Sequence, residues 1–276
     1  MRGREGMGSD GNPSRRIAMF WGMKVAIVMP VFNEAKLVER ALDRICACPA
    51  PKDGAGAALD RLIVIVDDGS TDGTAEIVKR LAEVPRAGIE VRGEMTSPNR
   101  GKGAAVRHGI DLAIEAGVDI VLIHDADLEY DPMDHGAVLA PILDGRADAV
   151  IGSRFLGQTH RVLYFWHSLA NRAITTLSNL FTNLNLSDIE CCLKAFTRDV
   201  ALALELKEER FGVEPEIIAR LAGMTIEDDE TKTDRSLRIF EVPVTYSGRT
   251  YSEGKKIRWQ DGIEAVAVIV KRNLWD

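Results

Sequence analysis

Two aspartates, Asp125 and Asp127, are separated by one residue and follow a short apolar run. Residues two apart in an extended backbone point the same way, so both carboxylates can contact one cation. Hard divalent ions such as Mg²⁺ prefer carboxylate and phosphate oxygens and retain some waters. A cation bound here could bridge a diphosphate and neutralise the charge that develops as the diphosphate leaves. Short acidic pairs are also common in solvated loops, and the position after an apolar run favours the metal site.

Three more polar clusters follow apolar runs: PVFNE at 30–34, DDGSTDGT at 67–74 and GSR at 152–154. Asp67 and Asp68 could form a metal or phospho-acceptor pocket, or could bind the backbone of the turn that follows them. The segment NRGKG at 99–103 precedes a helical pattern and offers backbone amides and cations for a phosphate. It matches neither a P-loop nor a G-x-G-x-x-G fingerprint, so alone it is weak evidence.

Predicted strands and helices alternate along the first 150 residues, and these elements must position the polar clusters. Apolar runs predict strands, and apolar residues three and four apart predict helices. The predicted strands are 24–29, 62–66, 88–92, 119–124 and 148–151, and the predicted helices are 35–46, a helix from 72, 103–116 and 133–144. This alternation predicts an α/β fold with a doubly wound, mostly parallel sheet. Ligands bind such sheets outside the carboxyl ends of the strands, where the polar clusters lie.

The second half of the chain is less regular. It predicts a long amphipathic helix at 163–184, strands at 193–197 and 237–245, and a final helix at 260–272. In the long helix Trp166 and Leu169 lie on the apolar face, and His167 and Asn171 lie on the other.

Composition excludes several classes of protein. The chain has 276 residues and a formal net charge of −7, so nothing global indicates a nucleic-acid partner. No apolar run reaches the length of a membrane-spanning helix. Residues 1–22 are rich in polar residues and Gly over most of their length, and are expected to form a disordered extension. The four cysteines lack C-x-x-C spacing, which favours reduced thiols and a cytoplasmic protein.

Together and in this order, the clusters resemble those of glycosyltransferase family 2, the inverting enzymes with a GT-A fold. The matching segments are VAIVMPVFNEA, VIVDDGSTDGT, NRGKGAAVRHG, HDADLEYDP and VIGSRF. Within that family the chain is most similar to the dolichol- or polyprenyl-phosphate mannosyl- and glucosyltransferases. The segments SDIECCLKAF, EVPVTY and RTYSEGKKIRWQDGIEAV support this subgroup. The resemblance covers residues 24–272 and implies a GT-A domain at 23–246, followed by a basic loop and a C-terminal helix at 247–276.

The resemblance implies a donor site and a metal site. The nucleotide-sugar site would consist of Pro30, Phe32, Glu34, Asp67, Asp68, Asn99, Lys102 and Asp125. The first three match the segment around the nucleotide base, and Asp67 or Asp68 matches the carboxylate at the base or ribose. Asp125, Asp127 and Glu129 match the site of Mg²⁺ or Mn²⁺, although relatives often have Gln where Glu129 stands.

An acceptor-phosphate site is implied as well, formed by Arg154, His167, Asn171 and Lys256. Relatives commonly have Arg and Ser at the positions of His167 and Asn171, and a mostly neutral His weakens the positive charge. Asp188 matches an aspartate that faces the acceptor, and with Asp127 it is the expected catalytic residue. A phosphate acceptor is largely a dianion at neutral pH and needs no strong base. A sugar hydroxyl does need one, and Asp188 would supply it.

The expected function is therefore inverting transfer of a hexose from a nucleotide diphosphate sugar to a polyprenyl phosphate. Transfer to a glycan or small-molecule hydroxyl and a non-catalytic nucleotide-sugar-binding module are the alternatives. A sugar-1-phosphate nucleotidyltransferase would need a Gly-rich, Arg-containing loop after the first strand, where PVFNE stands instead. A lipid acceptor implies peripheral contact with the inner face of the membrane, through residues 163–184 and 251–275.

Overall fold

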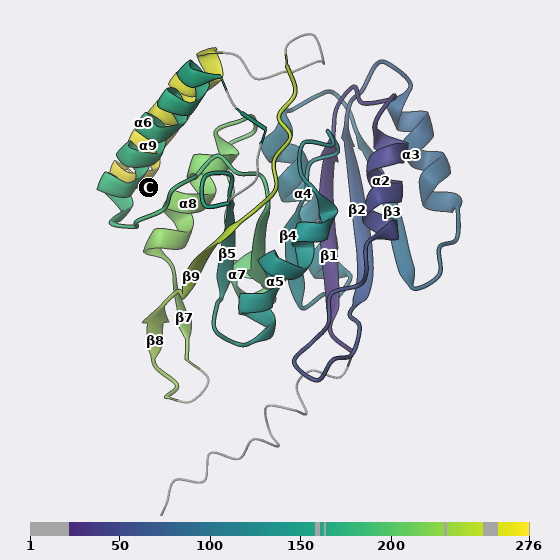
Figure 1. Cartoon of the computed structure of the whole chain (residues 1–276), viewed down its shortest axis with the longest axis horizontal. Helices are drawn as coiled ribbons and strands as arrows, with labels where there is room; N and C mark the ends of the chain where they lie inside the picture. The colour runs from purple at the N-terminus through teal and green to yellow at the C-terminus, as the bar shows by residue number, and fades with distance from the viewer. Residues whose placement is uncertain (1–21, 158–160, 163, 229–230, 251–258, 276) are drawn as a thin grey trace, which may run out of the picture.

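The computed structural model describes residues 22–157, 161–162, 164–228, 231–250 and 259–275 (Figure 1). Its centre is a seven-stranded sheet with the order β3-β2-β1-β4-β6-β5-β9. The strands are β1 (Lys24–Val31), β2 (Asp60–Asp68), β3 (Ile89–Thr96), β4 (Ile120–Ile123), β5 (Ala149–Ser153), β6 (Lys194–Thr197) and β9 (Ile239–Pro243). All except β6 run in the same direction, which confirms the predicted mostly parallel α/β sheet.

Helices cover the sheet on both sides. They are α2 (Val38–Ala47), α3 (Thr74–Glu83), α4 (Lys102–Glu115), α5 (His135–Leu143), α6 (Phe165–Thr182), α7 (Arg198–Ala203), α8 (Val213–Gly223) and α9 (Trp259–Leu274). A short 3₁₀ turn (Pro132–Asp134) precedes α5, and a small hairpin pairs β7 (Thr225–Glu227) with β8 (Asp234–Ser236). The helices α6, α8 and α9 pack on one another at one side of the molecule (Figure 1).

The strand order brings the polar clusters together. Strands β1 and β2 are apolar on both faces because helices cover both sides of the sheet. The order reverses between β1 and β4, and ligands of doubly wound sheets bind at such a reversal. The polar segments that follow β1, β2 and β4 therefore meet at one edge.

Strand β6 occupies a position that the alternation pattern does not predict. It lies between β4 and β5 and pairs antiparallel with both. Lys194, its first residue, is paired in register with Ile123 on one side and Ile151 on the other. The sheet consequently places a lysine in the protein interior beside the end of β4.

The orientation of α6 is the reverse of a simple amphipathic helix. Its fully buried positions are Thr175 and Ser178, whereas Trp166 and Leu180 are 73% and 77% exposed. The inward side carries Ile174 and Leu177, which pack against the core, beside polar residues such as Asn179, which forms hydrogen bonds with the backbone of Leu186. Most of the large apolar side chains on this helix thus face outward.

Helix α8 was not predicted from the sequence. Its segment, VEPEIIARLAG, begins with two glutamates and a proline that interrupt the apolar pattern. Both glutamates are nevertheless buried, and each has basic partners in the interior. Paired buried charges of this kind are invisible to a rule that equates burial with apolar residues.

Candidate active site

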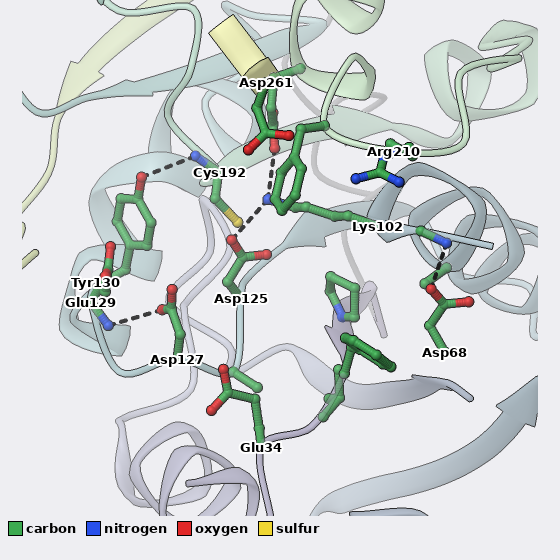
Figure 2. Close-up of a pocket in the computed structure, with 18 of the residues that line it drawn as sticks. Glu34, Asp68, Lys102, Asp125, Asp127, Glu129, Tyr130, Cys192, Arg210 and Asp261 are labelled. Atoms are coloured by element: carbon green, nitrogen blue, oxygen red, sulfur yellow. Dashed lines mark hydrogen bonds and ion pairs between the residues drawn. The ribbon is translucent and has the colours of Figure 1, made fainter. Parts of the chain in front are cut away.

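A cavity of about 640 Å³ opens at the carboxyl ends of β1, β2 and β4 (Figure 2). Its lining includes ten of the residues that the sequence predicts for the site: Pro30, Phe32, Glu34, Asp68, Asn99, Lys102, Asp125, Asp127, Glu129 and Arg154. Asp67, His167, Asn171 and Asp188 are not part of the lining. Lys256 lies outside the described residues, so its predicted role stays a prediction.

Each aspartate of the D-x-D segment is paired with a basic side chain. Asp125 accepts a hydrogen bond from Lys102 Nζ at 2.8 Å through Oδ2, and its buried Oδ1 has no partner. Asp127 Oδ2 lies 3.3 Å from Nη2 of Arg249. Burial, together with repulsion from Asp125 and Glu129, raises the pKa of Asp127 to about 7. The site thus concentrates negative charge and would gain from a bound cation.

Glu129 has a different task from the metal ligation that the sequence predicts. Its Oε2 accepts a hydrogen bond from Tyr246 at 2.5 Å, and its Oε1 accepts one from the backbone amide of Arg249 at 2.8 Å. Both oxygens therefore hold the segment 246–249. Within the described ranges, no three His, Cys, Asp or Glu side chains are placed together to hold a metal ion.

Asp125 and Asp127 nevertheless fit a divalent cation. Mg²⁺ is usually bound by one or two carboxylates, with substrate phosphates and waters completing the coordination. The unpartnered buried Oδ1 of Asp125 is an acceptor that lacks a donor in this structure. We infer that these two side chains could hold the metal with the diphosphate, without Glu129.

Asp67 and Asp68 separate into two roles. Asp68 accepts backbone hydrogen bonds from Arg100 at 2.9 Å and from Gly101 at 2.6 Å, and thereby fixes the NRGKG loop at the cavity. Asp67 accepts a hydrogen bond from the amide of Ser70 at 3.0 Å and is buried beneath the turn. Of the two, only Asp68 lines the cavity, where Asn99 donates to its carbonyl oxygen at 2.8 Å.

Three backbone amides of the NRGKG loop, which the sequence offers to a phosphate, donate within the protein: those of Arg100 and Gly101 to Asp68, and that of Gly103 to a carbonyl oxygen. Gly103 and Ala104 at the start of α4 donate to the carbonyl oxygens of Arg210 and Glu209, at 3.2 and 3.1 Å. A Cβ atom on Gly103 would lie 2.2 Å from the carbonyl oxygen of Glu208, so glycine is needed for this close approach. Asn99, Gly101 and Lys102 of this loop line the cavity, and the side chain of Lys102 reaches Asp125 there (Figure 2).

Arg154 contributes a partly buried guanidinium to the cavity lining. Its Nε and Nη2 donate to Asp188 at 2.6 and 2.7 Å, and Nη2 also donates to Asn171 at 3.0 Å. Burial opposes the positive charge, but Asp188 holds the pKa of Arg154 well above its usual value. The guanidinium also lies 5.2 Å from the centre of the Tyr246 ring. A fixed, fork-shaped cation of this kind suits a phosphate or carboxylate ligand.

Asp188 is fully buried, and both of its oxygens accept hydrogen bonds from Arg154. This arrangement favours a role in orienting Arg154 over the predicted alternative of a general base. Asn171 shares that role, because it contacts both Arg154 and Asp188. His167 packs edge-on against Tyr164, with ring centres 5.4 Å apart, and the structure does not bring it to the cavity.

Several cavity residues were missed by the reasoning from sequence: Glu190, Glu214, Tyr246 and Arg249. Glu190 carries a buried Oε1 without a partner, and burial and Glu214 raise its pKa to about 7. The sequence gives no sign of Glu214, because acidic residues are common in the first turn of a helix. Arg249 lies in an irregular segment and is not marked by any pattern either.

Comparison with known proteins identifies the family. The model of glycosyl transferase family 2 matches residues 26–204. The chain belongs to glycosyltransferase family 2. This assignment agrees with the D-x-D segment and the cavity at the β1/β4 reversal.

The relatives within the family include enzymes named for lipid phosphates. An undecaprenyl-phosphate 4-deoxy-4-formamido-L-arabinose transferase of Edwardsiella ictaluri is 30% identical over 84% of this chain, and the match covers 62% of that protein's length. The polyprenol monophosphomannose synthase of Mycolicibacterium smegmatis is 25% identical over 84% of the chain and 80% of its own. These names support the subgroup that the sequence predicts.

Solved structures confirm the GT-A fold. Glucosyl-3-phosphoglycerate synthase from Mycobacterium tuberculosis, in complex with Mn²⁺, UDP and its product, has a TM-score of 0.63 with this chain. The similarity covers 99% of this chain and 86% of that one, at 18% sequence identity. Within the described residues, none of the helices combines the length and the apolar character needed to cross a membrane.

Proposed function

We propose that this family 2 glycosyltransferase moves a hexose from a nucleotide diphosphate sugar to a polyprenyl phosphate, with inversion and with a divalent cation. One observation carries the proposal: a single cavity is lined both by Asp125 and Asp127 and by the partly buried guanidinium of Arg154. A cation held by the D-x-D pair would suit the departing diphosphate, and a fixed guanidinium suits an attacking phosphate. The relatives named for polyprenyl and undecaprenyl phosphates support this acceptor.

On the donor side, Pro30, Phe32 and Asp68 line the part of the cavity that would receive the nucleotide. Phe32 offers an exposed ring for a base, and Asp68 holds the loop that carries Lys102. A bound Mg²⁺ or Mn²⁺ would neutralise charge on the leaving diphosphate. Lys102 adds a fixed positive charge there, and such electrostatic stabilisation of a leaving group lowers the barrier.

On the acceptor side, Arg154 orients the phosphate for attack in line with the bond to the nucleotide. A phosphate monoester has a second pKa of about 6, so it is largely a dianion at neutral pH. Its oxygen then attacks the anomeric carbon without losing a proton, and positioning is the main task of the protein.

A hydroxyl acceptor is the second candidate, and Glu190 is the observation that favours it. This buried carboxyl has an unpartnered oxygen at the cavity and a pKa raised to about 7, which suits a general base. Under this mechanism the acceptor hydroxyl would give its proton to Glu190 as it attacks. Polyprenyl phosphate would then not stimulate turnover of the donor.

Removal of divalent ions provides the first test. We expect purified protein supplied with a UDP- or GDP-hexose, polyprenyl phosphate and Mn²⁺ to release nucleotide diphosphate. EDTA should reduce that release at least about 10²-fold, because the charge on the leaving group is no longer neutralised. Excess Mn²⁺ added after EDTA is the control and should restore the rate. Nucleotide-dependent thermal stabilisation without release would instead indicate a binding module.

A membrane-facing surface fits a lipid acceptor. Helices α6 and α9 lie side by side (Figure 1). Their exposed apolar side chains include Phe165, Trp166, Leu169, Leu180, Trp259 and Ile263, and the exposed Trp275 directly follows α9. Helix α6 contains no acidic residue and carries Arg172, although the whole chain has a net charge of −7. Aromatic and basic side chains together favour the interface of an anionic bilayer. We propose peripheral contact here, at the cytoplasmic face of the membrane, where the four free thiols would remain reduced.

The surface also adjoins the acceptor side of the cavity. Asn171 of α6 contacts Arg154, and Asp261 of α9 lines the cavity. A lipid phosphate could therefore reach Arg154 while its chain remains at the membrane.

Liposome binding tests this surface. We expect the protein to sediment with anionic liposomes at low salt. The double variant Trp166→Ser/Trp259→Ser should bind at least about tenfold more weakly, because each indole that is lost would otherwise bury a large apolar area in the membrane interface. Leu202→Ser, which changes an exposed apolar residue on α7, is the matched control and should bind as the original protein does. Equal binding of all three proteins would contradict the assignment.

A further inference from the structure

A line of alternating charges runs from the cavity into the interior. Asp125 is bonded to Lys102 Nζ at 2.8 Å, and the same ammonium lies 2.8 Å from Oε1 of Glu214. The other oxygen of Glu214 is bonded to Lys194, which is fully buried. Lys194 also donates to the carbonyl oxygen of Cys191. The order is thus carboxylate, ammonium, carboxylate, ammonium.

The inner end of this line is held by regular secondary structure, whereas its outer end lies in a loop. Lys194 is held in β6 between two neighbouring strands, and Glu214 is held at the start of α8. Asp125, by contrast, lies in the loop after β4 and has one unpartnered oxygen. Lys102 therefore has one fixed partner, Glu214, and one partner that can change.

Arg249 repeats this pattern on the second aspartate. Its guanidinium lies 3.3 Å from Asp127 and also 3.3 Å from both Glu34 and Glu129. Each aspartate of the D-x-D pair is thus neutralised by a basic side chain that has at least one further carboxylate partner. A metal ion bound to Asp125 and Asp127 would draw on the same carboxylate charge, and so would weaken or replace the contacts of these basic groups.

This replacement would be costly if Lys102 had no other partner. A buried ammonium that loses its carboxylate pays a large desolvation penalty, so it would compete with the metal for Asp125. Glu214 removes that competition, because it keeps a negative charge 2.8 Å from the ammonium whether or not Asp125 is occupied. Lys102 then remains in the cavity with its charge available to a diphosphate.

We propose that Glu214 is a positioning residue for donor binding. Glu214 is itself held by Lys194, and it keeps Lys102 in the cavity when Asp125 binds the metal ion of the donor complex. The inference rests on the proposed function, since it assumes a metal-dependent nucleotide diphosphate donor. Glu214 acts through Lys102 and need not touch the substrate.

Calorimetric binding of UDP and of GDP over a range of Mn²⁺ concentrations tests the role without requiring turnover. We expect Glu214→Gln to weaken Mn²⁺-dependent binding of the preferred nucleotide at least about tenfold, and to shift the Mn²⁺ requirement to higher concentrations. Turnover should show a raised KM for the donor, with an unchanged KM for the acceptor.

Glu216→Gln is the matched control. Glu216 lies two residues along the same helix and is equally buried, but it accepts backbone hydrogen bonds from Lys207 and Glu208 and is not part of the cavity lining. Its loss should lower the unfolding temperature without changing nucleotide binding. A double-mutant cycle with Lys102→Met adds a second control: when Lys102 is already absent, Glu214→Gln should cause little further loss of binding.

The outcomes are distinct. If the original protein binds neither nucleotide in a Mn²⁺-dependent manner, the proposed function fails, and this inference fails with it. If the original protein binds but Glu214→Gln binds equally well, or if Glu216→Gln shows the same loss, the inference alone is overturned. Should Glu214→Gln not fold, Glu214→Asp, which keeps the charge but withdraws the carboxylate from Lys102, is expected to show the same shift in Mn²⁺ requirement, and an unshifted requirement would overturn the inference.

Discussion

Replacing Asp127 with Asn is expected to reduce sugar transfer by about 10²- to 10³-fold, a loss typical of removing one group that stabilises charge in the transition state. Asp127 is one of the two D-x-D carboxylates that we propose for the divalent cation, whereas Glu129 is engaged with Tyr246 and Arg249. An amide oxygen carries no charge and would bind the cation much less tightly. Initial rates of nucleotide diphosphate release, at saturating donor and Mn²⁺, measure the effect.

At pH 8 the Asp127→Asn variant should unfold at the same temperature as the original protein or at a higher one. Burial and neighbouring carboxylates raise the pKa of Asp127 to about 7, above the value expected in the unfolded chain. A carboxyl group whose pKa is raised on folding destabilises the folded state increasingly as the pH rises from about 4 to about 7. Asn cannot ionise, so this destabilisation disappears.

Asp144→Asn is the control for this experiment, because Asp144 is exposed and pairs locally with Arg146. It should leave the rate unchanged. Retention of most activity by Asp127→Asn, or a large drop in its unfolding temperature, would contradict the assignment of Asp127 to the cation.

Replacing Arg154 with Lys should lower kcat/KM for polyprenyl phosphate by about 10²-fold while leaving nucleotide binding unchanged. A lysine keeps the charge, but it cannot bind Asp188 and Asn171 as the guanidinium does and also present a further N–H to the phosphate. Steady-state kinetics with varied acceptor, together with calorimetric binding of UDP or GDP, separate the two effects. An equal loss in donor binding would show that Arg154 serves the donor instead.

The variant Asp188→Asn cannot show whether Asp188 is a general base, although the sequence suggests this test. The fully buried Asp188 is the counter-ion of Arg154, and breaking a buried ion pair typically costs about 3–5 kcal/mol of stability. Loss of activity in that variant would therefore not identify a base. Glu190→Gln is the better comparison, because a hydroxyl acceptor would need Glu190 whereas a phosphate acceptor would not.

Local patterns were enough to predict the strands and the residues that follow them. The runs at 24–29 and 62–66 are apolar enough to indicate buried parallel strands, and the parallel order then places Asp68 and Asp125 at one edge. These predictions succeeded because they depend only on short-range periodicity and on one rule about where ligands bind.

Long-range pairing was not predictable in this way. The insertion of β6 between β4 and β5 joins segments about 70 residues apart, and it is this insertion that places Lys194 opposite Glu214. Arg249 reaches Asp127 across more than 100 residues of sequence. Neither contact leaves a periodic signal, so charged side chains in irregular or apolar segments could not be assigned partners beforehand.

The inward side of α6 has a consequence for how this helix tolerates substitution. Exchanging outward apolar residues such as Leu180 for polar ones removes little buried area and should be nearly neutral for folding. Enlarging Thr175 or Ser178 would overpack the junction with the domain. Substitutions in α6 should therefore be tolerated at exposed apolar positions such as Leu180. Larger side chains should not be tolerated at the small, buried hydroxyl residues Thr175 and Ser178.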